Sequence, residues 1–311
     1  MMKKVLFGLL LFSLFSCSSS KDDNELGNKS ISFDINEATI VADASLLLKI
    51  TVTPASLSDN VVWSSSNTSV AQVDKGRVKA LKEGTAIIKA TLDNISSSCK
   101  ITVIPSHYGY GYIDMGVSVK WAYCNIGASS PKEAGSYFLW GETTPRRIGD
   151  WRKYKFWSNG DDYYDVTFIK YVISPDRGSI DGNRTLELSD DAARANMGGN
   201  WRMPTWAECQ ELADNTDFKT SGNGILLTSK INGKTLFIPF GGYYDTDNVL
   251  SPTPRYFGQY AHVWTSSLTG YYDEDDSASA VAFSYLANGK ENGWAGMLYR
   301  MWSCPVRGVF K

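Results

Sequence analysis

Two segments of this chain concentrate aromatic side chains that could stack on a ligand. Residues 151–164 and 241–260 mix tyrosine, tryptophan and phenylalanine with charged and polar residues. Flat aromatic faces with polar edges suit sugar rings or protein partners, and exposing them without use is costly. The alternative is that these rings fold back as anchors of their own loops. The candidate ligand-binding residues are Trp157, Tyr163, Tyr164, Tyr243, Tyr244, Tyr256, Tyr271 and Tyr272.

An acidic run follows the last two of these tyrosines. Residues 273–276 place four carboxylates in succession, and Ca²⁺ binds through oxygen ligands of this kind. The EF-hand spacing is absent from the sequence. Asp273, Asp275 and Asp276 are therefore candidate calcium ligands, but we prefer the alternative of a solvated acidic loop and expect no other cofactor.

Residue types that carry catalysis are scarce. The chain has two histidines, His107 and His262, and its sequence has no Gly-x-Ser-x-Gly, phosphate-binding glycine loop or His-Glu-x-x-His motif. Glu208 belongs with Thr205 to a capping box, which predicts a helix over about residues 206–213 and gives this carboxylate a structural role. Glycoside hydrolysis would need two acids flanking one cleft, and the sequence offers candidate acids without placing two of them together. We predict that the protein is not an enzyme.

The composition divides the chain into two unlike parts. Its 311 residues suffice for two domains. Residues 17–104 contain only two aromatic residues, Phe33 and Trp63, whereas residues 105–311 hold all 17 tyrosines and nine of the ten tryptophans. The formal net charge of −2 gives no basic excess, which makes nucleic acid an unexpected partner.

The beginning of the chain predicts export. Lys3 and Lys4 precede an apolar run that is too short to span a bilayer, as in a signal peptide. The sequence Leu14-Phe15-Ser16-Cys17 resembles the lipobox of bacterial lipoproteins. That resemblance implies removal of residues 1–16, acylation of Cys17 and a membrane as partner through the lipid anchor.

A polar segment follows the lipobox. Residues 17–29 lack periodicity and predict a flexible tether. Lys21-Asp22-Asp23 resembles the acidic signal that directs some Gram-negative lipoproteins to the outer face of the outer membrane. The alternative is an ordinary solvated linker, which would have a similar composition. We expect an outer-membrane lipoprotein exposed at the cell surface.

Residues 30–104 predict a small β-sandwich. Apolar and polar residues alternate in short runs bounded by turn residues, at 48–52, 61–63, 70–73, 77–80, 85–90 and 100–103. Val61-Val62-Trp63-Ser64, Val70-Ala71-Gln72-Val73 and Gly84-Thr85-Ala86 resemble the bacterial immunoglobulin-like domain, group 2. The resemblance implies a spacer. Gly76 suits a left-handed turn position, and Trp63 is expected to anchor the core.

Residues 105–311 carry the blocks of a second resemblance. They are similar in order to the Fibrobacter succinogenes major paralogous domain, a family thought to adopt a C-type-lectin-like α+β fold. The blocks lie at 112–116, 119–128, 137–142, 190–193, 199–205 with Glu208 and Leu212, 238–242, 263–267 and 304–309. The resemblance implies no reaction. The lectin comparison favours a disulfide between Cys209 and Cys304, although Cys124 permits other pairings and Cys99 is expected to be a lone buried cysteine.

The predicted fold is an all-β immunoglobulin-like sandwich plus an α+β C-type-lectin-like domain. From the order of parts we expect a non-enzymatic surface lipoprotein whose last domain binds extracellular glycan or a protein partner, in adhesion or nutrient capture. One alternative is a structural or assembly subunit of a surface appendage or polysaccharide-handling complex. A carbohydrate-active enzyme is the third and least favoured hypothesis.

Overall fold

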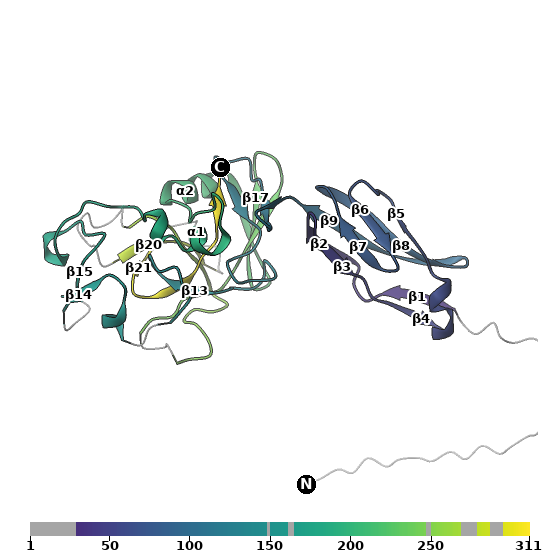
Figure 1. Ribbon diagram of the computed structural model, residues 1–311, viewed down its shortest axis with the longest axis horizontal. Coiled ribbons are helices and arrows are strands. Elements are labelled where there is room, and N and C mark those ends of the chain that lie inside the picture. Colours follow the sequence, from purple (N-terminus) through teal and green to yellow (C-terminus); the bar gives the residue numbers. More distant parts are fainter. Residues whose placement is uncertain (1–28, 148–149, 161–164, 247–249, 269–278, 287–294) are drawn as a thin grey trace, which may run out of the picture.

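The computed structural model describes residues 29–311 except 148–149, 161–164, 247–249, 269–278 and 287–294. Strands predominate, and they gather in two bodies along the chain (Figure 1). We call residues 30–104 the N-terminal domain and residues 105–311 the C-terminal domain. Among the described residues, no helix is long and apolar enough to cross a membrane.

The N-terminal domain is built from three small sheets. The sheets follow the orders β2-β9-β8-β5, β3-β7-β6 and β1-β4, in which β2 and β9 run parallel and all other neighbours run antiparallel. The strands are β1 Ser30–Phe33, β2 Glu37–Val41, β3 Ser45–Leu47, β4 Ile50–Thr53, β5 Val62–Ser65, β6 Ala71–Asp74, β7 Arg77–Ala80, β8 Gly84–Leu92 and β9 Ile95–Ile104.

Alternation along the strands produces the core of this domain. In β8, Ala86, Ile88 and Ala90 are buried while the residues between them face outward, because successive side chains of a strand point to opposite sides. Trp63 packs against this core and meets Phe33 edge-on at 5.7 Å, as expected of an anchor. Gly76 has φ of +82°, which confirms its predicted turn role.

In its described residues the C-terminal domain contains two α-helices, three single-turn 3-10 helices and several short antiparallel sheets. The sheet orders are β10-β11-β12-β23, β13-β22, β14-β15, β16-β17-β18 and β19-β20-β21. The strands are β10 Ser106–His107, β11 Tyr110–Ile113, β12 Lys120–Ala122, β13 Tyr137–Leu139, β14 Trp157–Asn159, β15 Thr167–Phe168, β16 Thr216–Ser221, β17 Gly224–Ser229, β18 Thr235–Pro239, β19 Tyr260–Trp264, β20 Ser279–Leu286, β21 Ala295–Tyr299, β22 Ser303–Pro305 and β23 Val309–Phe310.

Both helices begin at a side-chain cap, and the cap of α2 is the one that the sequence predicts. Helix α2, Trp206–Asp214, starts at Thr205, whose hydroxyl accepts the Glu208 N–H while the Glu208 carboxylate accepts the Thr205 N–H. Helix α1, Ala192–Met197, starts at Asp191, which accepts the Arg194 N–H, and ends at Gly198. The capping box is confirmed, and with it the structural role of Glu208.

Strand β19 separates two hydrophobic cores of the C-terminal domain. Ala261 and Val263 belong to one core, which also contains Trp121, while Trp264 belongs to the other, which also contains Trp140 and Trp201. The Trp264 indole donates to the Phe138 carbonyl at 2.8 Å, and the Trp140 indole donates to the Thr265 carbonyl at 2.9 Å. These indoles therefore act as scaffold, because each buried N–H has an acceptor.

The predicted disulfide is wrong. Cys209 and Cys304 are both buried free thiols, and they lie in different cores. Cys209 packs on α2 against the core of Trp121, whereas Cys304 pairs in β22 with Phe138 of β13 in the core of Trp264. Cys99 is buried and unpaired in β9, as predicted.

Candidate functional site

Five rings of the C-terminal domain form a connected cluster, which we call the aromatic circuit. Tyr243 contacts Tyr256 at 5.8 Å between ring centroids, Tyr256 contacts Tyr260 at 5.2 Å, and Tyr260 stacks on His262 at 5.2 Å. His262 returns to Tyr243 at 5.5 Å, and Trp302 stacks on Tyr243 at 4.8 Å. Offset and edge contacts of this kind hold the rings in fixed relative orientations.

Backbone pairing places the circuit. Tyr243 and Arg255 exchange backbone hydrogen bonds of 3.1 and 2.8 Å, so the segment that contains Tyr256 folds back onto Tyr243. Gly242, with φ of +58°, permits this approach, because a Cβ there would collide with the Arg255 carbonyl. Strand β19 supplies Tyr260 and His262 from one face. The circuit is thus built on a strand and a closed loop.

Tyr256 is the exposed member of the circuit. Its side chain is 48% exposed, and the neighbouring Phe257 is 50% exposed. Tyr256 has φ of +55°, and its carbonyl accepts the N–H groups of Gln259 and Tyr260 at 3.0 Å each. A left-handed conformation is costly for a tyrosine and is found preferentially at functional positions. Tyr256 combines an exposed ring with a strained backbone that two hydrogen bonds hold in place, and it is therefore our main candidate for a ligand contact.

A charged pair lies beside the circuit. The Arg255 guanidinium forms an ion pair with the Asp245 carboxylate, which is buried. Both residues belong to the segment that carries Tyr243 and Tyr256, and both charges act on the Tyr243 hydroxyl. The site therefore combines flat apolar faces with a compensated pair of polar groups, the composition typical of sites that orient a polar ligand.

The imidazole of His262 is a weak base. Burial lowers its pKa from 6.5 to about 4, and its Nδ1 lies 2.7 Å from the Ser284 hydroxyl. A serine and histidine at this distance could suggest a nucleophile with its base. A general base works best with a pKa near the working pH, so this histidine is poorly suited to activate Ser284. Burial also raises the pKa of Tyr243 to about 12, which keeps its hydroxyl protonated.

The structure separates the predicted aromatic candidates. Tyr243 is 8% exposed and Tyr244 is 3% exposed, so both act as loop anchors. Tyr244 meets Tyr137 edge-on, donates to the Pro252 carbonyl at 3.3 Å and carries the Arg147 guanidinium 3.7 Å above its ring. The anchor interpretation thus holds for these two tyrosines, whereas Tyr256 remains a candidate for ligand contact.

Trp157 lies in a different aromatic group. It is half-buried on β14, where it meets Trp151 edge-on at 6.4 Å and packs against the core. Its indole Nε1 is buried and has no acceptor within the described part of the chain. No ring contact in the described residues joins this tryptophan to the circuit. Tyr163, Tyr164, Tyr271 and Tyr272 lie outside the described residues.

The candidate calcium ligands Asp273, Asp275 and Asp276 also lie outside the described residues. Within the ranges that the structure describes, no group of three or more histidine, cysteine, aspartate or glutamate side chains could hold a metal ion.

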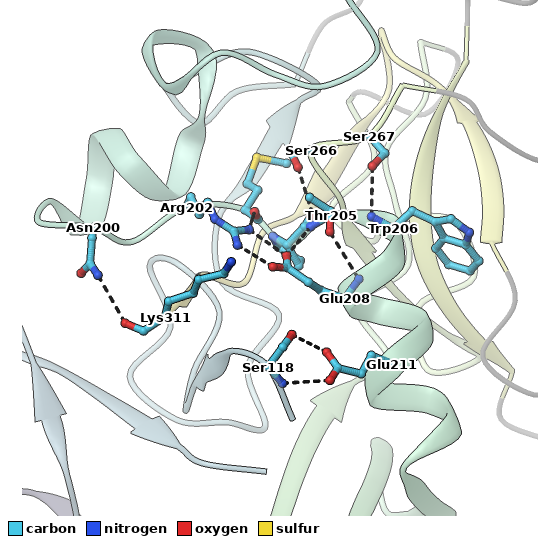
Figure 2. A network of polar contacts seen from close by, with 12 residues as sticks. Ser118, Asn200, Arg202, Thr205, Trp206, Glu208, Glu211, Ser266, Ser267 and Lys311 are labelled. Carbon is cyan, nitrogen blue, oxygen red and sulfur yellow. Dashed lines mark hydrogen bonds and ion pairs between the residues drawn. The ribbon is translucent and has the colours of Figure 1, made fainter. Parts of the chain in front are cut away.

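A second polar cluster surrounds the start of α2, and its groups hold the fold together (Figure 2). Arg202 pairs with Glu208 at 2.5 Å, Glu211 accepts from Ser118, and Ser267 accepts the Trp206 N–H at 3.0 Å. Burial opposes ionisation of Glu208, but hydrogen bonds from Arg202 and Thr205 outweigh it and lower the pKa. These carboxylates are committed to arginine, serine and backbone partners, which argues against acid catalysis here.

Sequence reasoning missed Tyr260, His262 and Trp302 as members of the circuit. The alternation of β19 is the signal that could have placed Tyr260 and His262 on one face. Trp302 follows β21, and its stacking on Tyr243 joins residues far apart in the chain. The sequence carries no local signal for that contact.

Comparisons with known proteins identify the N-terminal domain. Residues 28–103 match the model of the bacterial Ig-like domain (group 2). An uncharacterized protein of Clostridium acetobutylicum is 35% identical over 102 residues, which are 31% of this chain and 10% of that protein. The chain therefore spans about a tenth of the length of the curated relative that it matches. The immunoglobulin-like prediction for residues 30–104 is confirmed.

Proposed function

We propose that this protein is a non-enzymatic surface lipoprotein whose C-terminal domain binds extracellular glycan. The observation that carries the proposal is Tyr256, an exposed tyrosine in a left-handed conformation whose ring contacts Tyr243 and Tyr260 of the aromatic circuit. A tyrosine fixed in this way offers a rigid flat face at low entropic cost. The CH groups of a pyranose ring pack well on such a face.

The groups around Tyr256 support a sugar ligand. Phe257 extends the apolar area, and the guanidinium of Arg255, whose side chain is 43% exposed, carries N–H groups of the kind that donate to hydroxyl groups. The weak basicity of His262 and the structural commitments of Glu208 support a binding role over hydrolysis. A C-type-lectin-like fold for residues 105–311, which the sequence blocks of that resemblance suggest, is part of the same proposal.

The order of parts supports display at the cell surface. In this proposal, lipid chains on Cys17 hold the protein at the outer membrane, residues 17–29 form a tether, and the N-terminal domain carries the C-terminal domain outward. The lipobox resemblance and the acidic tether are the sequence features behind it. A Cys17→Ser chain expressed in a bacterial host should leave the membrane fraction, and external protease should digest only the acylated, surface-displayed form.

Binding should be tested on the mature chain. A glycan array probed with residues 17–311, with and without Ca²⁺, should reveal at least one ligand class. Tyr256→Ala should weaken that binding by at least tenfold. Tyr108→Ala is the matched control, because Tyr108 is also exposed, at 65%, and also has a positive φ, but makes no ring contact with the circuit among the described residues.

Two results would refute the glycan proposal. One is an array without ligand in both conditions, and the other is binding that Tyr256→Ala leaves unchanged. Cross-linking on intact cells addresses the alternative of an assembly subunit, because a fixed stoichiometric protein neighbour would favour that role. Turnover of a carbohydrate that a single aspartate or glutamate substitution abolishes would favour an enzyme.

A further inference from the structure

The ends of two strands in the N-terminal domain point to two different cores. In β2, Ile40 packs against the core of its own domain, whereas the next residue, Val41, packs against the core of the C-terminal domain. In β9, Val103 is buried in the first core and Ile104 in the second. Because successive residues of a strand face opposite sides, one pair of adjacent strands serves both domains.

The C-terminal domain has a position shaped to receive these side chains. A Cβ at Gly111 in β11 would lie 2.7 Å from Ile104 Cδ1 and 2.9 Å from Val41 Cγ2. Gly111 is not among the glycines with positive φ, so the backbone there does not require glycine. The space that Val41 and Ile104 occupy is what excludes a larger residue at this position.

The connection between the domains is short and is also tied down. Only Pro105 separates the end of β9 from the start of β10, and its carbonyl accepts the Tyr112 N–H at 3.1 Å. In β10, His107 stacks on Phe310 at 3.9 Å, and its carbonyl accepts the Trp201 indole at 3.0 Å. At the edge of the contact, Lys234 pairs with Glu83 at 2.7 Å.

From these contacts we infer that the N-terminal domain is a specific structural partner of the C-terminal domain. It completes the second core with Val41 and Ile104 and holds the two domains in one fixed orientation. A spacer of the kind implied by the family resemblance would be exchangeable for another such domain. This one is matched to its neighbour, and the inference does not depend on what the C-terminal domain binds.

Thermal unfolding of the mature chain tests the contribution to the core. Nine of the ten tryptophans lie in residues 105–311, so tryptophan fluorescence follows the C-terminal domain. Val41→Ser, although it lies in the other domain, should lower the melting temperature of this signal by about 2–4 °C. Val62→Ser is the matched control, because Val62 is in the same domain, is 66% exposed and belongs to neither core.

Small-angle X-ray scattering tests the fixed orientation independently. The wild-type chain should give one narrow distribution of interdomain distances, and Gly111→Val should broaden it by driving Val41 and Ile104 apart from β11. The inference is overturned if Val41→Ser leaves the fluorescence melting temperature at the wild-type value. A wild-type distribution already as broad as that of Gly111→Val would overturn it equally.

Discussion

The two domains differ in the kinds of residue that form their cores. The N-terminal core consists mainly of small and aliphatic residues on alternating strand positions, such as Ala86, Ile88 and Ala90. Among its described residues, the C-terminal domain buries four whole indoles and two arginines, Arg300 and Arg307, at 1% exposure or less. The first kind of core depends on shape alone, whereas the second also depends on hydrogen-bond partners for its buried polar groups.

Arg307 illustrates the second kind of core. Its Nε donates to Asn125 Oδ1 and its Nη1 to the Phe237 carbonyl, both at 2.7 Å. Burial lowers the pKa of this guanidinium to about 10, because the interior disfavours the charge. In return for the cost of burying this charge, Arg307 forms hydrogen bonds that join segments far apart in the sequence. The comparison predicts that a single substitution in the core destabilises the C-terminal domain more than the N-terminal domain.

The largest effect should come from an indole that is both packed and hydrogen-bonded. Trp264→Ala should destabilise the C-terminal domain by about 3–5 kcal/mol, because it leaves a cavity and removes the donor to the Phe138 carbonyl. Trp63→Ala in the other domain should cost less, because Trp63 is only partly buried. Urea unfolding followed by tryptophan fluorescence and circular dichroism measures both, and equal losses would contradict the comparison.

Acidification should affect the two domains unequally. The N-terminal domain contains no histidine, whereas the pKa of His262 is about 4 in the folded C-terminal domain and 6.5 in its ordinary state. The unfolded chain therefore binds the extra proton between pH 6.5 and pH 4, and stability falls as the pH falls through this range, by about 3 kcal/mol. His262→Gln should flatten this slope in a series of urea titrations. An unchanged slope would show that His262 does not cause it.

The helix cap should have a moderate effect. Thr205→Ala removes the acceptor of the Glu208 N–H and should destabilise the C-terminal domain by about 1 kcal/mol. Thr205→Ser keeps a hydroxyl at the cap and should retain most of the stability. The two variants can be compared by chemical denaturation. A loss as large in the serine variant would mean that the threonine methyl group, and not the cap, is responsible.

The smallest effect concerns the cysteines. Because Cys99, Cys124, Cys209 and Cys304 are free thiols, adding dithiothreitol should leave the melting temperature of both domains unchanged. All four should react with a thiol reagent after denaturation without prior reduction. A reductant-dependent decrease in melting temperature would restore the disulfide hypothesis for Cys209 and Cys304.

Local patterns predicted the N-terminal domain well and the C-terminal domain only in parts. The alternating runs correspond to β4 to β9, and the capping box located α2. Strand β2 was not predicted, because Ile40 and Val41 are both apolar and face two different cores, which hides the alternation. A pattern of period two signals a strand only when one of its faces is solvated.

The candidate site was predicted in composition but not in arrangement. The sequence indicated that residues 241–260 matter, and Tyr256 is exposed there as a ligand contact requires. It did not separate the buried Tyr243 and Tyr244 from Tyr256. That distinction rests on the pairing of Tyr243 with Arg255 and on the stacking of Trp302, which are contacts between distant residues.

The position of the last strand has a consequence for how the protein is made. Strand β23 pairs with β12, joining Lys120 to Phe310 and Trp121 to Val309, and His107 stacks on Phe310. The C-terminal domain therefore cannot close this sheet before Val309 and Phe310 have been synthesised. Until then this edge of β12 has no partner strand, so the sheet is completed only after the segments between the two strands have been made.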